Sequence, residues 1–213
     1  MAKFAAHELA CLRGQNLIFT NLVFDMTDGD ALVLAGPNGS GKSSLIRVLA
    51  GLIRPFSGEL SWDGENVFDD IQTHFDRMLY VGHSNAIKSA LSVRENLTFW
   101  AELYEEAEKV EHALEVFDLA VIADNPGRIL SSGQRRRLNL ARLLVANRAV
   151  WILDEPTVGL DVNSCKGLED LINNHRKSGG MVILSTHVGI DVPDHQILDV
   201  GIYSETAINA EVC

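Results

Sequence analysis

The feature that most limits how this chain of 213 residues can fold is a glycine-rich octapeptide that fits the pattern GxxxxGK[ST]. An apolar run at 31–34 precedes it, and a segment of helical periodicity at 42–52 follows it. In this context the backbone turns from a strand into a helix with its N–H groups directed inward, an arrangement that binds phosphate. The residues of the octapeptide are Gly36, Pro37, Asn38, Gly39, Ser40, Gly41, Lys42 and Ser43.

The octapeptide predicts a nucleotide site that uses Mg²⁺. Lys42 is expected to reach the β- and γ-phosphates, and the hydroxyl of Ser43 is expected to ligate the metal. Ser44, the next residue, is included in the expected nucleotide site. A glycine-rich turn without a ligand is the alternative, and the complete motif between a strand and a helix disfavours it.

The rest of the chain alternates short apolar runs with longer helical segments, the pattern of an α/β domain with a mainly parallel sheet. Residues up to about 26 favour short β segments instead, with 17–19 and 22–24 separated by Thr20-Asn21. From about 88 to 145 the apolar strands give way to helices, which indicates a helical subdomain within a single domain spanning 1–213. The expected strands of the core are 31–34, 79–81, 149–153 and 181–184, and the expected helices are 42–52, 93–103, 109–117, 134–145 and 163–176.

One of these strands ends in two acidic residues, Asp154 and Glu155. Beside a phosphate loop, Asp154 is expected to ligate Mg²⁺ and Glu155 to act as the general base that activates water. A plain strand end with a turn is the alternative explanation of Asp-Glu-Pro, and it would be preferred if the phosphate loop were absent.

A second anion site is predicted where Leu130-Ser131-Ser132-Gly133-Gln134 leads into a helix. Small residues at a helix N-terminus offer backbone N–H groups, and here the Ser131 hydroxyl, to a phosphate. One ATP has a single triphosphate, so we predict a homodimer in which this site covers the ATP held by the other subunit. An ordinary serine N-cap would explain Ser131 but not the rest of the string.

With these residues, the chain resembles the nucleotide-binding subunits of ABC transporters over nearly its whole length. The octapeptide matches Walker A, 130–134 resemble the LSGGQ signature, and 150–155 match Walker B. Gly159-Leu160-Asp161 resembles the D-loop, and Ser185-Thr186-His187 resembles the loop of the switch histidine. The resemblance implies a P-loop NTPase core with an N-terminal antiparallel β subdomain and a helical insertion. It also implies ATP and Mg²⁺ as ligands and integral membrane permease subunits as partners.

Three residues depart from the pattern that the resemblance implies. Arg13 stands where an aromatic residue usually lies under the adenine, and its guanidinium can still stack on a base. His83 replaces a glutamine in the catalytic set, and Ser132 replaces the first signature glycine.

The segments 12–19, 80–83 and 87–97 are further similar to the ATPase subunit of the cytochrome c maturation system, a haem exporter family. This similarity implies the cytoplasmic face of the inner membrane, or alternatively the matrix face of the mitochondrial inner membrane.

Composition limits the possible partners. The formal net charge is −11, from 18 Lys and Arg against 29 Asp and Glu, which disfavours nucleic acid. The longest stretch without formal charge, 178–190, is shorter than the roughly 18 to 20 residues of a membrane span, so no direct membrane insertion is expected. Three widely spaced cysteines indicate a reducing compartment and no structural metal.

The sequence leaves three other functions open: another exporter with a different substrate, a P-loop kinase, or a nucleotide sensor that does not hydrolyse ATP.

We expect the membrane partner to dock on the loop from His83 to Asn96. The contact would use Ala86, Ile87, Ala90 and Leu91, unless these residues merely pack the helical subdomain on the core. Arg135, Arg136 and Arg137 are expected to form internal ion pairs.

Overall fold

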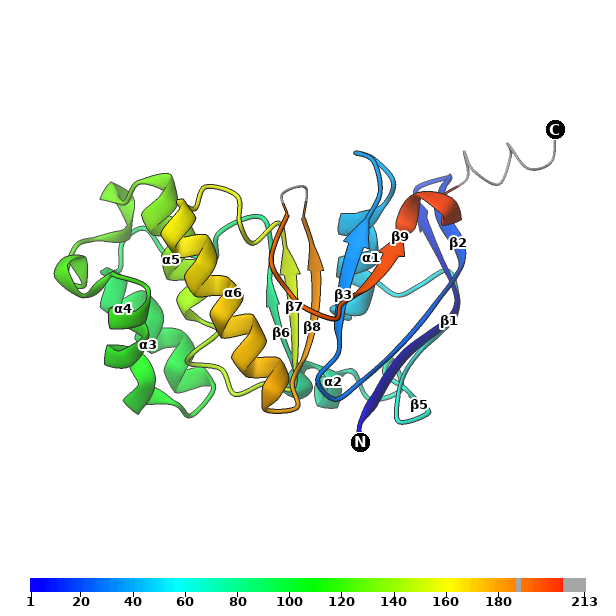
Figure 1. The fold of residues 1–213 in the computed structure, drawn as a ribbon, viewed down its shortest axis with the longest axis horizontal. Helices are drawn as coiled ribbons and strands as arrows, with labels where there is room; N and C mark the ends of the chain where they lie inside the picture. Colours follow the sequence, from blue (N-terminus) through cyan, green and yellow to red (C-terminus); the bar gives the residue numbers. More distant parts are fainter. Residues whose placement is uncertain (187–188, 205–213) are drawn as a thin grey trace.

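The computed structural model describes residues 1–186 and 189–204, which form two sheets and a group of helices (Figure 1). A five-stranded sheet has the order β6-β7-β8-β3-β9, and its described strand pairs are parallel. A four-stranded antiparallel sheet has the order β2-β1-β4-β5. Among the described helices, none is both long enough and apolar enough to span a bilayer.

The parallel sheet occupies the middle of the molecule and is covered on both faces. Side chains alternate between the faces of a strand, so Ile152 and Ile183 pack toward the antiparallel sheet, whereas Leu153 and Leu184 pack toward the helices. Both faces are therefore dry, which explains the nearly continuous apolar runs. The strands are β3 (Ala31–Ala35), β6 (Met78–Val81), β7 (Val150–Asp154), β8 (Met181–Ser185) and β9 (Gln196–Asp199).

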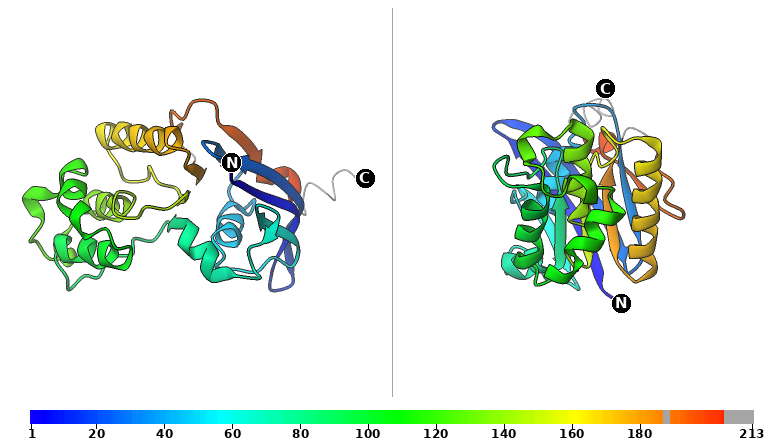
Figure 2. Two further views of the ribbon diagram at one scale, coloured as in Figure 1. Left: turned by 90° about the horizontal axis from the view of Figure 1, so that it is seen from below. Right: turned by 90° about the vertical axis from the view of Figure 1, so that its left-hand side faces the viewer.

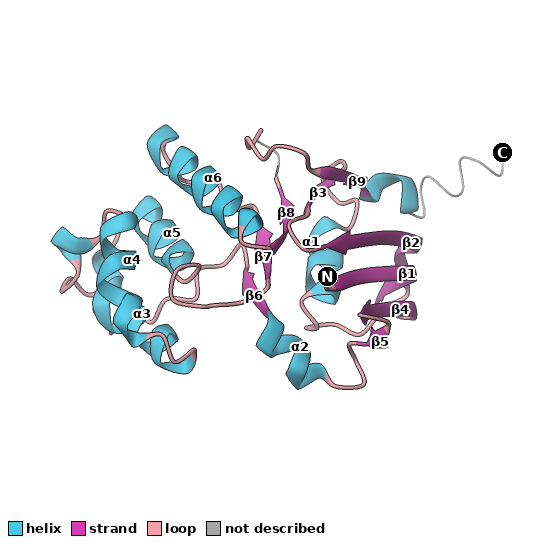
Figure 3. Ribbon diagram, turned by 60° about the horizontal axis from the view of Figure 1, so that its bottom comes forward, coloured by secondary structure: helices cyan, strands magenta, loops and turns pink. Residues whose placement is uncertain are grey.

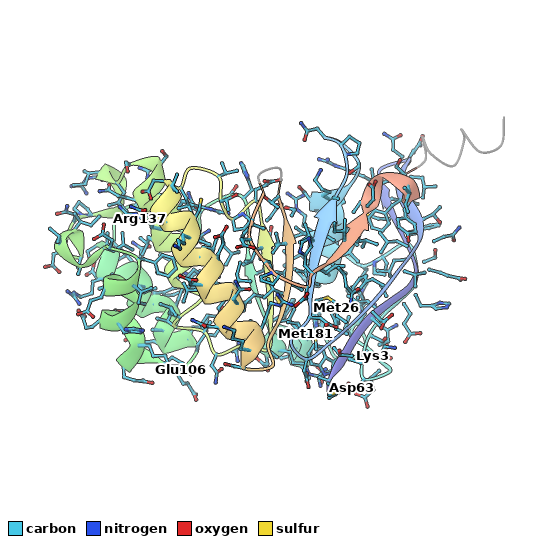
Figure 4. All side chains as sticks on the ribbon, in the orientation of Figure 1. Lys3, Met26, Asp63, Glu106, Arg137 and Met181 are labelled. Carbon is cyan, nitrogen blue, oxygen red and sulfur yellow. The ribbon has the colours of Figure 1, made fainter. Side chains whose placement is uncertain are left out.

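The antiparallel sheet packs on one face of the parallel sheet with α1 between them. Met26 and Met181, one from each sheet, belong to the same buried cluster and lie near the centre of the molecule in Figure 4. The predicted break at Thr20-Asn21 does not end the strand, since β2 runs for 12 residues. It is an irregularity within the strand, where the pairing with β1 shifts register and Asn21 takes a left-handed conformation, φ 55°. The strands are β1 (Lys3–Arg13), β2 (Asn16–Thr27), β4 (Ser57–Trp62) and β5 (Glu65–Asn66).

Helices gather at the end of the molecule opposite the antiparallel sheet (Figures 2 and 3). α3, α4, α5 and α6 share one buried cluster with the second face of the parallel sheet. No strand is assigned between β6 and β7, in agreement with the strand-free stretch that the sequence predicts. The helices are α1 (Lys42–Leu49), α2 (Ile71–Arg77), α3 (Val93–Leu103), α4 (Val110–Val116), α5 (Ser132–Ala141) and α6 (Val162–Lys177), with 3-10 turns at Ala107–Lys109, Ala120–Ile122, Gly127–Ile129 and Val200–Tyr203.

A buried amide fixes the loop that enters the helical region. Asn96, 3% exposed, donates to the carbonyls of Lys88, Leu91 and Ser92 at 2.8–3.2 Å. Its Oδ1 accepts the backbone N–H of Lys88 at 2.7 Å. Because Asn96 lies on α3, the expected docking loop is shorter than predicted and ends at Ser92, the N-cap of that helix.

We expect Asn96→Ala to lower the free energy of unfolding by about 1–3 kcal/mol, because it leaves buried backbone groups without partners. Urea unfolding followed by circular dichroism measures the loss. Asn125→Ala, at an exposed position of the same region, serves as the control. Equal midpoints for the two variants would contradict this account of the loop.

Candidate nucleotide-binding site

The register of the parallel sheet brings three chain segments to one edge. Ser185 of β8 pairs with Leu34 on one side and with Asp154 on the other. The carboxyl ends of parallel strands meet at the same edge of a sheet, where ligands bind in open α/β folds. The phosphate loop, which follows Ala35, therefore begins at the same edge as the acidic end of β7, with only β8 between them.

Backbone conformations in the phosphate loop require glycine. Gly36, Gly39 and Gly41 have φ of 126°, 85° and 101°. A Cβ on Gly36 would lie 2.8 Å from Ser40 Oγ, and one on Gly41 would lie 2.6 Å from Ile18 Cγ2. The loop therefore packs so closely on its surroundings that the backbone itself forms the lining.

Lys42 is the first residue of α1 and points back into the loop. Its side chain is 7% exposed, and Nζ donates to the carbonyls of Gly36 at 2.7 Å and Pro37 at 3.0 Å. The loop therefore combines a buried ammonium group with the N-terminus of a helix. Both favour an anion, and phosphate oxygens suit them.

A cavity of about 270 Å³ adjoins the loop and is lined by several of the predicted nucleotide residues. Glu155 lines it from the end of β7, and Arg13 and Ile18 line it from the β1–β2 hairpin. Ile18 is absent from the sequence prediction, because an apolar residue in an apolar strand carries no local signal of a ligand. The other lining residues are Asn38, Gly39, Gly41, Lys42, Ser43 and Ser44.

The two acidic residues after β7 differ in burial and are joined through Ser185. Asp154 is 4% exposed, and its Oδ1 accepts the Ser185 hydroxyl at 2.8 Å. The backbone N–H of Glu155 donates to both the hydroxyl and the carbonyl oxygen of Ser185, each at 3.1 Å. Glu155 takes a left-handed conformation, φ 50°, and is one of the residues that line the cavity. Ser185 is thus a site residue that the sequence analysis did not single out for this role.

The three consecutive arginines of α5 have different partners, so the prediction that all form ion pairs is wrong. Arg137 pairs with Asp118 at 3.0 Å, at the helical end of the molecule where Figure 4 labels it. Arg135 donates to the carbonyl of Arg128 at 2.9 Å. Arg136 is buried and donates to backbone carbonyls around Glu155. A buried run of carbonyls can hold a cation without a carboxylate, which the sequence does not reveal.

Several predicted residues lie outside this cavity. Ser131 caps α5 and exchanges hydrogen bonds with Gln134, whose N–H reaches Ser131 Oγ at 3.2 Å. This confirms the serine N-cap that was the alternative interpretation of Ser131.

Other predicted residues also lie outside the cavity. Asp161 caps α6, and hydrogen bonds from Ser164 hold the pKa of its carboxyl below the usual range. His83 lines a separate groove of about 420 Å³, and His187 lies outside the described residues. None of the signature residues 131–134 lines the phosphate-loop cavity of this chain.

The donor atoms present fit a magnesium–nucleotide complex. Ser43 and Asp154 supply oxygen, the ligand that Mg²⁺ prefers, and Mg²⁺ commonly takes only one or two protein carboxylates beside phosphate oxygens. In the described part of the chain, no group of three or more His, Cys, Asp or Glu side chains could hold a metal ion by itself, so phosphate oxygens would have to complete the site. Ser40 Oγ is buried in the loop without a hydrogen-bond partner there, a polar atom that a phosphate oxygen would satisfy.

A parallel sheet with a phosphate loop after one strand and an acidic pair after another defines a phosphate-loop nucleotide-binding protein. A family model described as ABC transporter matches residues 19–158. The chain belongs to the ABC transporter family as an ATP-binding subunit, and it is an ATPase of that family. This confirms the resemblance and the expected fold, and it decides against a P-loop kinase.

Individual relatives support the same assignment. The cytochrome c biogenesis ATP-binding export protein CcmA of Paramagnetospirillum magneticum is 53% identical over 200 residues, covering 92% of each chain. The protein of the same name from Rhodospirillum rubrum is 52% identical over 198 residues, covering 92% of this chain and 85% of its own. A solved ATP-binding subunit of an ABC transporter is 25% identical with a TM-score of 0.81, covering 93% of this chain and 86% of its own.

We expect Gly36→Ala to weaken ATP binding by about tenfold or more, because a side chain at φ 126° is strained and meets Ser40 Oγ. Strain of this kind costs about 1–3 kcal/mol, and its relief moves the N–H groups of the loop. Calorimetric titration with ATP and Mg²⁺ measures the change. Gly167→Ala is the control, because no atom lies within 4 Å of its added Cβ. Equal affinities in the two variants would be inconsistent with a backbone-lined phosphate site.

Proposed function

We propose that this chain binds and hydrolyses ATP with Mg²⁺ as a homodimer and thereby drives an integral membrane partner in haem handling for c-type cytochrome biogenesis. The observation that carries the ATP part is the cavity shared by the phosphate loop, Arg13 and Glu155. Two relatives that are 52–53% identical to this chain are named cytochrome c biogenesis ATP-binding export proteins, and these names support the part of the proposal on c-type cytochrome biogenesis. Another exported substrate is the alternative.

Residues of the cavity and the adjacent Asp154 have separate tasks in this proposal. Lys42 binds the β- and γ-phosphates as a cation, and the loop N–H groups bind their oxygens. Ser43 and Asp154 hold Mg²⁺, which when bound neutralises negative charge on the phosphates. Glu155 accepts a proton from the attacking water on its carboxylate. Arg13 stacks its guanidinium on the adenine, with Ile18 as an apolar neighbour.

The homodimer follows from where the signature residues lie. They form the N-terminus of α5, an anion-binding arrangement, but they line no part of the cavity that holds the phosphate loop in the same chain. A second copy can supply these N–H groups to the far side of the nucleotide. Accepting the N–H of Gln134 leaves the Ser131 hydroxyl able to donate its own proton to a phosphate oxygen.

We propose that the membrane partner docks in the groove of about 420 Å³. It lies in the loop after β6, between the sheet and the helices, and it contains no acidic residue although the chain carries a net charge of −11. Ile87 both lines the groove and packs on the helical cluster, so its packing leaves it available for the proposed docking. The lining residues are His83, Ser84, Asn85, Ile87, Ser89, Gly127 and Arg135.

Since the named relatives are bacterial, we place the complex at the cytoplasmic face of the inner membrane.

Glu155→Gln is expected to lower kcat for ATP hydrolysis by about 10²- to 10⁴-fold while ATP still binds, because the amide keeps the shape but cannot accept the proton. Phosphate release at saturating ATP and an equilibrium binding titration measure the two quantities. Glu115→Gln, at an exposed position on α4, is the control. Near-normal hydrolysis by the Glu155 variant would remove Glu155 from the proposed mechanism.

Asn85→Trp is expected to release the chain from its membrane partner and to stop c-type cytochrome assembly, because the indole fills the groove. Membrane fractionation and haem staining of periplasmic c-type cytochromes measure the two effects. Asn125→Trp, exposed on the helical region but not lining the groove, serves as the control. Both variants should remain folded and bind ATP. Normal membrane association of the Asn85 variant would place the docking surface elsewhere.

A further inference from the structure

Arg136 stands out among the cations of the chain, because it is only 4% exposed and is surrounded by backbone carbonyls. Its Nε donates to Pro156 at 3.1 Å, and its Nη2 donates to Asp154 at 3.0 Å and to Glu155 at 2.7 Å. Its Nη1 donates to Gly82 at 2.9 Å. The guanidinium thus joins the segment that carries Glu155 to the loop that follows β6.

Burying this cation is costly, so its hydrogen bonds must offset a large loss of hydration. Burial holds the pKa of Arg136 below its usual range, and the charges of Asp154 and Glu155 oppose this effect. A guanidinium has five N–H donors in a rigid planar fork, whereas an ammonium has three on one nitrogen. Only the fork can reach carbonyls that lie on different sides of the group.

The carbonyls of Asp154, Glu155 and Pro156 are successive, and all three point to the same guanidinium. A regular strand alternates the directions of its carbonyls. Here Glu155 has φ 50°, a left-handed conformation that costs a residue with a side chain roughly 1–2 kcal/mol. Convergence on Arg136 stabilises the turn at which Glu155 lines the cavity.

The fourth bond of Arg136 reaches toward the proposed partner groove. Gly82 immediately precedes His83, the first residue that lines the groove. Figure 3 shows α5, which carries Arg136, between the parallel sheet and the helices α3 and α4. One side chain therefore contacts the catalytic segment and the start of the groove loop.

We propose that Arg136 is a positioning residue that fixes the backbone of Glu155 in its left-handed turn and ties this turn to the groove loop at Gly82. The proposal rests on the role of Glu155 as general base. Arg136 does not line the phosphate-loop cavity, and its hydrogen bonds go to backbone carbonyls, so it acts through the backbone.

The test is Arg136→Lys in the full-length chain. Lysine keeps the charge but cannot bond to all the carbonyls, so the Glu155 carboxylate shifts from its position. A displacement of about 1 Å can cost on the order of 10²-fold in rate, so we expect kcat to fall about 10- to 100-fold while the dissociation constant of ATP is retained. Each variant is assayed at the same interval below its own Tm.

Arg142→Lys is the matched control. Arg142 is also buried, 7% exposed, and it also bonds to a strand carbonyl, that of Tyr80, at 3.4 Å. Its guanidinium lies 3.8 Å from the ring centre of Trp100, and its hydrogen bonds go to Asn139 and Tyr80 rather than to residues 154–156. We expect this variant to lower Tm without the loss in kcat. An equal loss of kcat in both variants would assign the effect of Arg136 to general stability and overturn the proposal.

A double-mutant cycle separates the proposal from the function on which it rests. In the Glu155→Gln background, Arg136→Lys should lower the single-turnover rate less than about threefold, because the base through which it acts is gone. A full additional loss would overturn the positioning role. Normal hydrolysis by Glu155→Gln alone would instead refute the general-base assignment.

Arg136→Gln provides a second variant in case the lysine variant does not fold. Its amide can replace part of the fork, so we expect a kcat below that of the wild type with ATP binding retained. If neither Arg136 variant folds while Arg142→Lys does, Arg136 serves the core and the proposal is wrong.

Discussion

The pairing of Ser185 with Leu34 and with Asp154 is the constraint on which the site depends. It sets β3, β8 and β7 in a register that ends all three strands at one edge. The phosphate loop follows from that edge, and the Ser185 hydroxyl lies between the Asp154 carboxylate and the Glu155 backbone. A slip by one residue would turn every side chain of a strand to the opposite face. Since both faces are packed with apolar side chains, such a slip is strongly disfavoured, and the edge stays aligned.

Local signals account for what the sequence predicted well. The glycines of the phosphate loop stand where the backbone has positive φ, so their spacing in the sequence predicts the conformation of the loop. α3 was predicted at 93–103 and is found at Val93–Leu103, because Ser92 and Glu95 form a capping box that can be recognised from sequence. The end of α5 was predicted too late, at 145 rather than Ala141, since apolar residues continue past the helix into the core.

What the sequence did not predict depends on contacts between distant segments. β9 is an edge strand with exposed residues, and α2 has seven residues, so neither has a strong periodic pattern. β2 continues past the left-handed Asn21, and its pairing with β1 resumes there in a shifted register. Arg136 resembles a solvated charge on a polar helix until the fold places four carbonyls around it. Single residues that organise a site through backbone groups leave no motif of their own.

Two buried polar side chains hold the loop between β6 and α3 at its two ends. Arg136 binds the carbonyl of Gly82 at the start, and Asn96 binds the backbone of Lys88, Leu91 and Ser92 at the end. Residues 83–86, between these anchors, are exposed. Breaking a buried hydrogen bond without replacement costs about 1–3 kcal/mol, so the two ends of the loop are held more firmly than its exposed middle. Through Arg136 this loop is joined to the segment that carries Glu155, so one side chain links the groove that we propose for the partner to the residue that we propose as the general base.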